Sequence, residues 1–353
     1  MKANKHFFVV LVTMLGVAVS FVTNIHAQYS SGKKQAGYHL LNKIEVGGEG
    51  GWDALITDPD AQRLYVSHGT KVVVIDTSTD KVVGEIPNTN GVHGIAIARK
   101  LGRGFTSNGR DNTVTIFDLK TLKNLGTVKT DKNPDIIIFD SSSNRVFSFN
   151  GGSNDATVIE AADGKVAGTV ALGGKPEFAV SNGKGTVYVN IEDKSEVVAI
   201  DAKTLEVKTH WTLAPAGEEP TGLAMDTKTN RLFIVCGNKK MVVMDAATGK
   251  VITDLPTGDG TDGAEFDPGA KLAFSSNGEG TLTVVHEDSK DKFTVVENVT
   301  TQPRARTMAV DTKTHKVYLP TAQFGPAPAA TTAQPRPRAP MLPGSFVILV
   351  YGK

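Results

Sequence analysis

Side chains that could do chemistry recur at one position of a repeating pattern in this 353-residue sequence. Carboxylate oxygens are the ligands that a hard cation such as Ca²⁺ prefers, and several of them close together attract cationic groups. If the repeat brings this position to one mouth, it predicts a site for a divalent cation or a cationic ligand. In chain order the position holds Asp53, Gly94, Asp135, Glu177, Thr221, Asp262 and Arg306.

The same carboxylates also have a structural interpretation. Two of them follow a proline in a turn, as Asn133-Pro134-Asp135 and Lys175-Pro176-Glu177. Acidic side chains in such turns commonly accept hydrogen bonds from nearby backbone N–H groups and cap the following strand. The spacing gives no ligand distances, so we favour turn capping and leave the cation site open.

Two further candidates directly precede this position. Trp52 and His93 are assigned equivalent places in the first two repeats, where they could offer a stacking surface and a titratable group to a ligand. A histidine in a turn serves more often as a hydrogen-bonding partner than as a catalyst, so we assign no catalytic residue. The lone Cys236 follows an apolar run and is expected to be a small buried filler.

The elements that must position these residues are marked by an apolar run that ends in an acidic residue or its substitute and a turn. The run recurs as 72–76, 114–118, 157–160, 197–201, 241–245 and 282–286, and its last residues are 42, 42, 41, 44 and 41 positions apart. Runs this short and this rich in β-branched residues form strands rather than helices. A period near 42 is typical of a four-stranded β-propeller blade.

Seven such units fit the sequence, and the last one lacks its outer strand. Residues 39–46 have the character of the other outer strands and can supply it, which removes the open edges of the stack. The sequence therefore predicts an all-β fold over 38–353: a seven-bladed β-propeller of four-stranded antiparallel blades, closed by an N-terminal strand. The Pro-, Ala- and Thr-rich stretch 321–343 is then an extended insertion in one loop of the last blade.

The first 27 residues are expected to be a secretory signal peptide. Lys2 and Lys5 precede an apolar run from Phe7 to Val22, and Ala27 closes a cleavage site. An uncleaved membrane anchor is the alternative, since the run is nearly long enough to span a thin bilayer. Cleavage would leave a short linker, 28–37, and a periplasmic or secreted protein with no membrane span.

The second strands carry a resemblance to a known family. They read Leu64-Tyr65-Val66-Ser67, Gly104-Phe105-Thr106-Ser107, Val187-Tyr188-Val189-Asn190 and Ala273-Phe274-Ser275-Ser276. In these motifs the chain resembles the YVTN-type β-propeller repeat proteins, which are related to the propellers of cytochrome d1 nitrite reductases. The resemblance covers nearly all of 38–353 and implies the fold. It implies no single activity, because propellers host many unrelated functions.

Composition and motifs exclude several classes. One cysteine allows no internal disulfide and no cysteine-ligated zinc or iron–sulfur site. The 38 basic residues against 37 acidic ones provide no phosphate-tracking stripe, so nucleic acid is not expected as a partner. The sequence also lacks the G-x-S-x-G, H-E-x-x-H and P-loop motifs.

Two function classes remain. The first is an exported, non-catalytic binding or scaffold module, a monomer without a cofactor, whose loop face and central channel engage a protein, peptide or cell-envelope partner, or a small ligand. The second is a metal-dependent, lactonase-like hydrolase that holds a divalent cation at the channel mouth, with His93 as a proton carrier. We favour the first, because the carboxylates are unevenly spread around the ring and no acid–base pair is placed by the sequence.

Overall fold

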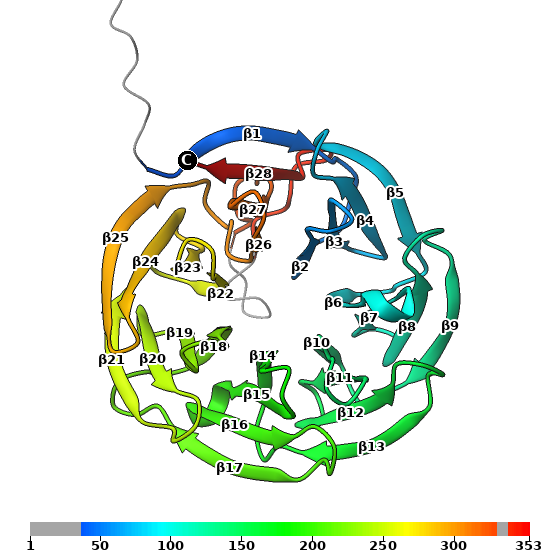
Figure 1. Ribbon diagram of the computed structural model, residues 1–353. Coiled ribbons are helices and arrows are strands. Elements are labelled where there is room, and N and C mark those ends of the chain that lie inside the picture. Colours follow the sequence, from blue (N-terminus) through cyan, green and yellow to red (C-terminus); the bar gives the residue numbers. More distant parts are fainter. Residues whose placement is uncertain (1–36, 330–337) are drawn as a thin grey trace, which may run out of the picture. The chain divides into compact units, whose positions relative to one another are not determined.

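The computed structural model describes residues 37–329 and 338–353. Its strands form seven four-stranded antiparallel sheets arranged as blades around a central axis (Figure 1), which confirms the predicted β-propeller. The proposed signal peptide lies outside the described residues, as do all but residue 37 of the proposed linker and residues 330–337 of the insertion. Within the described residues, the structure contains no helix of the length and apolarity needed to cross a membrane.

The first four blades follow one another along the chain, each running from its inner to its outer strand. Blade 1 contains β2 (Leu55–Asp58), β3 (Arg63–His68), β4 (Lys71–Asp76) and β5 (Lys81–Pro87). Blade 2 contains β6 (Val92–Ala98), β7 (Arg103–Asn108), β8 (Thr113–Asp118) and β9 (Asn124–Lys129), with the short 3₁₀ helix η1 (Arg99–Leu101). Blade 3 contains β10 (Pro134–Asp140), β11 (Arg145–Asn150), β12 (Asp155–Glu160) and β13 (Val166–Ala171). Blade 4 contains β14 (Pro176–Ser181), β15 (Thr186–Ile191), β16 (Glu196–Asp201) and β17 (Val207–Thr212), with η2 (Glu192–Lys194).

The last three blades complete the circle. Blade 5 contains β18 (Pro220–Asp226), β19 (Arg231–Cys236), β20 (Lys240–Asp245) and β21 (Val251–Pro256). Blade 6 contains β22 (Thr261–Asp267), β23 (Leu272–Asn277), β24 (Thr281–Ser289) and β25 (Lys292–Thr300). Blade 7 contains β26 (Ala309–Asp311), β27 (Lys316–Thr321), β28 (Val347–Gly352) and the N-terminal β1 (His39–Glu45).

The apolar runs of the repeat form the third strand of each blade. The acidic residue at the end of the run accepts hydrogen bonds from the backbone of the turn that follows. The four central residues of β4 are buried, because both faces of a blade pack against neighbouring blades. The Asp76 carboxylate accepts hydrogen bonds from the backbone N–H groups of Ser78 and Thr79 at 2.9 and 3.0 Å. The same arrangement recurs at Asp118 and Asp245, so a short acidic side chain ends the strand and fixes the turn.

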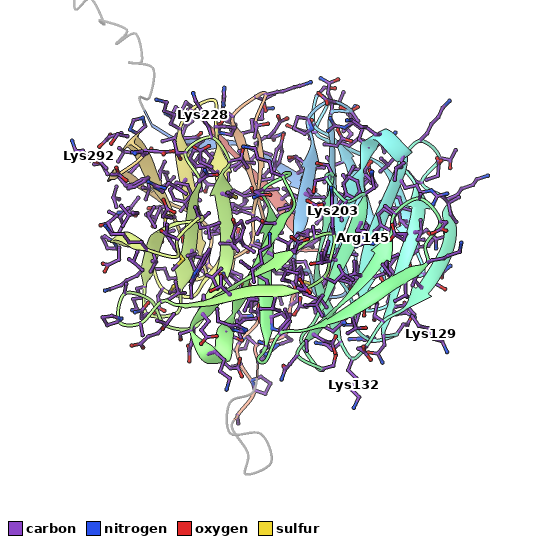
Figure 2. All side chains as sticks on the ribbon, turned by 60° about the horizontal axis from the view of Figure 1, so that its bottom comes forward. Lys129, Lys132, Arg145, Lys203, Lys228 and Lys292 are labelled. Atoms are coloured by element: carbon purple, nitrogen blue, oxygen red, sulfur yellow. The ribbon has the colours of Figure 1, made fainter. Side chains whose placement is uncertain are left out.

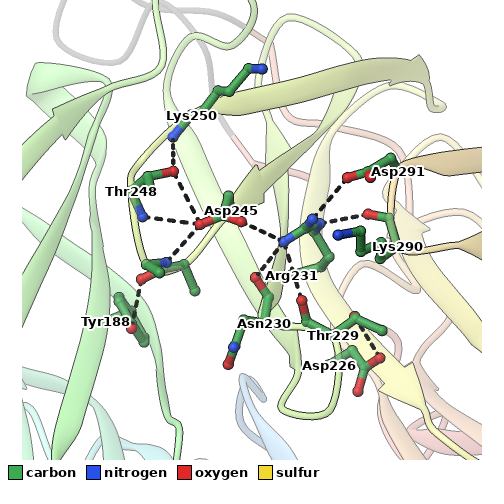
Figure 3. Close-up of polar contacts among 12 residues, drawn as sticks. Tyr188, Asp226, Thr229, Asn230, Arg231, Asp245, Thr248, Lys250, Lys290 and Asp291 are labelled. Carbon is green, nitrogen blue, oxygen red and sulfur yellow. Dashed lines mark hydrogen bonds and ion pairs between the residues drawn. The ribbon is translucent and has the colours of Figure 1, made fainter.

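An arginine at the start of several second strands joins one blade to the next. The guanidinium of Arg231 in blade 5 donates to the Lys290 carbonyl at 2.6 Å and to the Asp291 carboxylate at 2.8 Å, both in blade 6 (Figure 3). In blade 3 the corresponding Arg145 donates to the carbonyl of Lys203 in blade 4 at 2.7 Å. Both residues are labelled in Figure 2. These bonds lie on the face where first strands turn into second strands, so they stabilise the ring away from the central mouth.

The ring closes where the two ends of the propeller pair. Strand β1 runs antiparallel to β28, with His39 opposite Gly352 and Glu45 opposite Val347. Ile44 on β1 is 4% exposed and packs in a cluster with Ile348 and other residues of blades 1 and 7. The outer strand of the last blade therefore comes from the other end of the sequence, as the repeat predicted.

Replacing Ile44 with Ala should test how much this closure contributes. Because the side chain is buried between blades 1 and 7, we expect a loss of about 3 kcal/mol in the free energy of unfolding, measured by urea denaturation. The matched control is Leu40→Ala on the same strand, whose side chain is 50% exposed and should matter little. Equal effects of the two substitutions would contradict the role given to β1.

Candidate functional site

The predicted ring of residues converges at one mouth of the central channel. A cavity of about 450 Å³ opens there, where the loops from outer strands lead into inner strands. Lys175 and Glu192, which sequence reasoning did not single out, also face this cavity. Of the predicted site residues it is lined by Asp53, His93, Asp135, Glu177, Thr221, Asp262 and Arg306.

Strand pairing corrects the alignment of the second blade by one residue. Val92 lies opposite Asn108 as Pro134 lies opposite Asn150, so His93 and not Gly94 is equivalent to Asp135. The placement of His93 beside Trp52 in the repeat was therefore wrong, because matching sequence letters does not fix the pairing of strands. Gly94 instead allows close packing of two inner strands, since a Cβ there would lie 2.9 Å from the Ile137 nitrogen.

Backbone hydrogen bonds between neighbouring blades hold the start of each inner strand. The Ala54 N–H donates to the His93 carbonyl at 3.1 Å, and the Gly263 N–H donates to the Arg306 carbonyl at 2.8 Å. The Thr307 hydroxyl donates to the Asp53 carbonyl at 2.8 Å across the junction between blades 7 and 1. The backbone satisfies its own polar groups in this way, which leaves the side chains free to point into the mouth.

The carboxylates of the mouth form ion pairs with basic side chains and do not accept hydrogen bonds that cap turns. His93 Nδ1 lies 2.6 Å from an Asp53 oxygen and 3.5 Å from an Asp135 oxygen. Lys175 Nζ lies 2.7 Å from a Glu177 oxygen, and it also contacts Glu192.

The remaining pair joins two neighbouring blades. Arg306 Nη1 lies 3.1 Å from an Asp262 oxygen. Among the described residues no backbone N–H donates to the side chains of Asp53, Asp135, Glu177 or Asp262. The expectation that they cap turns was therefore wrong, because they face the cavity instead. Thr221 alone behaves structurally, since its hydroxyl donates to the Thr261 carbonyl at 3.1 Å.

Burial and mutual repulsion raise the pKa values of three mouth carboxyls. Burial, followed by the charge of Asp53, raises the pKa of Asp135 to about 6. Burial also raises the pKa of Asp262 to about 7 and, with the charge of Asp135, that of Glu177 to about 8. Burial opposes protonation of His93, but the hydrogen bond to Asp53 and the charge of Asp135 outweigh it and raise its pKa. The mouth therefore holds carboxyls that a bound cation would stabilise in their ionised form.

The charges lining the mouth are unbalanced in favour of the acids. The fixed cations are three, Lys175, Arg304 and Arg306. The carboxyl groups are five, namely Asp53, Asp135, Glu177, Glu192 and Asp262. When all are ionised the acids exceed the fixed cations even if His93 is protonated, and this favours a cationic guest.

One subset of these residues could hold a metal ion. Single ligand atoms of Asp53, His93 and Asp135 all lie within 4.8 Å of one another. Imidazole nitrogen and carboxylate oxygen suit Zn²⁺ or Mn²⁺, so the donor types fit. However, His93 Nδ1, the imidazole nitrogen nearest these carboxylates, already lies against an Asp53 oxygen and so has a partner in place of a metal ion.

Below the mouth, the channel is mostly apolar, and it contains one carboxyl group that sequence reasoning missed. A cavity of about 250 Å³ is lined largely by aliphatic and aromatic residues of the inner strands, and Glu265 on β22 is its only charged lining residue among those described. Burial raises the pKa of Glu265 to about 8. The sequence carried a signal for this residue, because other repeats have an apolar residue at the equivalent position. Strand pairing shows that Ile56 and Ile138 are two of these equivalents.

Trp52 lies beside the mouth cavity and not inside it. It lines an adjoining depression of about 750 Å³ together with Glu49, Arg304, Phe324, Arg338 and Met341, which we call the Trp52 groove. The indole stacks on Phe346 with ring centroids 5.0 Å apart. The remaining predicted residue, Cys236, is buried and has its thiol pKa raised to about 12 by burial, as expected for a filler.

A comparison with protein families gives one match over more than half of the chain. The family model described as outer membrane protein assembly factor BamB matches residues 110–316. The resemblance to YVTN-type repeat proteins stays a prediction beside this match.

Comparisons with individual proteins give partial or distant likenesses. The protein YncE of Salmonella typhi, described as uncharacterized, is 27% identical over 78 residues, and so is YncE of Salmonella typhimurium. The match spans only about a fifth of these relatives, 22% of each chain.

Two solved structures are similar in fold. Hydrazine synthase of Kuenenia stuttgartiensis has a TM-score of 0.68 at 16% identity, over 78% of this chain and 94% of that one. A chain of the mitotic checkpoint complex has a TM-score of 0.71 at 12% identity, over 96% and 99%. At such identities the likeness concerns the propeller fold alone.

Proposed function

The chain belongs to the family of the outer membrane protein assembly factor BamB, and on that premise we propose that it is a non-catalytic binding module of the cell envelope. In this proposal the propeller holds a protein partner by seating a Lys or Arg side chain of that partner in the acidic mouth. The family description, which names an assembly factor, supports a protein as the partner. The mouth chemistry supports a cationic group as the part that is bound.

One observation carries the proposal: the mouth gathers more carboxyls than it has cations to neutralise them. The side chains of Asp135, Glu177 and Asp262 are only 17%, 12% and 12% exposed, so water screens their repulsion poorly. Burial, and after it the charges of neighbouring carboxylates, raises the pKa values of all three groups. A guest ammonium or guanidinium would relieve this repulsion and form charge-assisted hydrogen bonds.

Neutralising two mouth carboxyls should weaken the binding of a basic peptide. The probe is a fluorescein-labelled octapeptide of Gly and Ser with a central Arg-Arg pair, followed by fluorescence anisotropy at pH 8. We expect Asp135→Asn with Glu177→Gln to raise Kd at least about tenfold, because charge-assisted contacts contribute more than a kcal/mol each. Affinity of the unaltered protein should rise between about pH 5.5 and 8.5, since the cation binds ionised carboxyls whose pKa values are about 6, 7 and 8.

The matched control removes the same charge from the opposite face. Asp163 and Glu206 lie in exposed turns between third and fourth strands, and Asp163→Asn with Glu206→Gln should leave Kd unchanged. Two results would contradict the proposal. One is equal affinity for a peptide with Gln-Gln in place of Arg-Arg, and the other is an affinity for the Arg-Arg peptide that falls as the pH rises.

A metal-dependent, lactonase-like hydrolase is the second candidate, and the grouping of Asp53, His93 and Asp135 favours it. These residues would hold a divalent cation, which would supply an activated water for hydrolysis. We rank it second because the raised pKa of His93 favours the protonated imidazole, which cannot act as a ligand.

Melting temperatures separate the two candidates. The binding-module proposal expects the same Tm in millimolar Mn²⁺, Zn²⁺ or Ca²⁺ as in EDTA. A resident metal should raise Tm by several degrees, and Asp53→Asn should abolish that rise. A metal-induced rise that Asp163→Asn preserves and Asp53→Asn removes would decide for the metal site.

Export is part of the proposal and rests on residues 1–27 together with the family description. The basic start, the apolar run and Ala27 support a cleaved signal peptide. N-terminal sequencing of protein recovered from the envelope fraction should begin at Gln28. Recovery in the cytoplasm with Met1 intact would contradict export.

A further inference from the structure

We propose that the Trp52 groove is a second binding site, which takes a peptide segment carrying an acidic and an aromatic side chain. This inference rests on the proposed function only in taking the ligand to be part of a protein. The groove lies on the mouth face of blade 7, between the loop that enters β26 and the described ends of the insertion 321–343. Its volume of about 750 Å³ exceeds that of the mouth cavity.

The aromatic floor of the groove is held rigidly. Trp52 packs on Phe346, and Phe346 in turn stacks on the buried His68 at 4.4 Å between ring centroids. The ring centroids of Phe324 and Trp52 lie 6.1 Å apart. An isolated antiparallel β-bridge to Met341 holds the backbone of Phe324 in place. Both Trp52 and Phe324 remain partly exposed. A partly exposed indole on a fixed support offers an aromatic side chain a stacking surface with little loss of conformational entropy.

Arg304 supplies the charge that the aromatic floor lacks. Its guanidinium lies 3.7 Å above the Phe324 ring, which orients the side chain. The backbone at Arg304 adopts a positive φ of 67°, a strained conformation for a residue with a side chain, and its N–H donates to the Gly278 carbonyl at 2.7 Å. Such strain is commonly stored where a side chain must be presented to a ligand.

The guanidinium of Arg304 has no acidic partner within 4.0 Å among residues 37–329 and 338–353, whereas the neighbouring Arg306 is paired with Asp262. Arg338 and the paired Arg306 also line the groove, and among the residues that the structure describes its only carboxyl group is that of Glu49. A carboxylate of the ligand would therefore complete a charge-assisted pair that the groove itself leaves unmade.

The groove and the acidic mouth share a wall, so the mouth face has two adjacent regions of opposite charge. Arg304 and Arg306 form that wall, because they line both cavities. A third depression of about 640 Å³, which Arg306 also lines, includes Trp52, Asp53, His93 and Arg338. A segment lying across both regions would place a basic side chain in the mouth and an acidic, aromatic portion in the groove. Opposite charges in fixed order also select the direction in which a peptide lies.

The fluorescence of Trp52 can test this site directly. The chain has two tryptophans, and Trp211 lies on the outer strand β17 against Tyr188, so Trp211→Phe leaves Trp52 as the sole reporter. The probe is an acetylated, amidated octapeptide with central Phe-Glu-Glu-Phe and Gly and Ser flanks. We expect a saturable change in Trp52 emission, and about tenfold weaker binding when Gln replaces both Glu residues or when Arg304→Gln is introduced.

A charge-matched control and a second variant complete the design. Lys81→Gln removes a positive charge from an exposed position on the opposite face and should leave the titration unchanged. Asp135→Asn with Glu177→Gln should retain binding of the acidic peptide, so failure at the mouth and failure at the groove are told apart.

Three results would overturn the proposal. The first is the absence of a saturable change up to millimolar peptide. The second is equal affinity for the Glu and Gln peptides. The third is a response of Trp52 to phosphatidylglycerol vesicles but not to the peptide, which would assign the groove to a membrane surface.

Discussion

Pairing of β1 with β28 is the constraint on which the rest of the molecule depends. Every other blade is built from consecutive strands, but the last one borrows its outer strand from the opposite end of the chain. Without that strand β28 would be an open edge, and the core between blades 7 and 1, beside the junction where Thr307 binds the Asp53 carbonyl, would lose the packing of Ile44. The mouth is a property of the closed ring, because Asp53 and Arg306 come from the blades that closure brings together.

Closure also explains how the protein can keep crowded acids at its centre. Hydrogen bonds between neighbouring blades hold the inner strands, and arginines such as Arg145 and Arg231 join the blades on the face opposite the mouth. The mouth carboxyls are therefore not needed to hold the backbone in place. Interactions elsewhere in the ring offset the unfavourable free energy of their mutual repulsion. Sites that hold like charges together in this way are costly to stability and are commonly retained for binding.

The architecture could be predicted from the sequence because its signals are local. Each third strand is a short β-branched run, and each ends in a residue such as Asp76 that caps its own turn. The mouth was located correctly for the same reason, since its residues lie at fixed places relative to those strands. The position of His93 was missed by one residue, because register depends on the pairing of Val92 with Asn108 and not on spacing. Glu265 was missed because the channel that buries it is lined by inner strands of several blades, which no single repeat contains. Lys175 and Arg304 were missed because their partners Glu192 and Phe324 lie outside the turns that were compared between repeats.

The position of the paired strands β1 and β28 sets the orientation of the mouth face when the propeller is attached to a support. Val347 lies beside Thr321, on the side of the insertion and the mouth, so Gly352 and its partner His39 lie at the opposite face. A support coupled at either of these ends would meet the back of the ring. The acidic mouth and the Trp52 groove would then both point outward, so the protein could be immobilised or fused at either end without shielding the face that carries its charges.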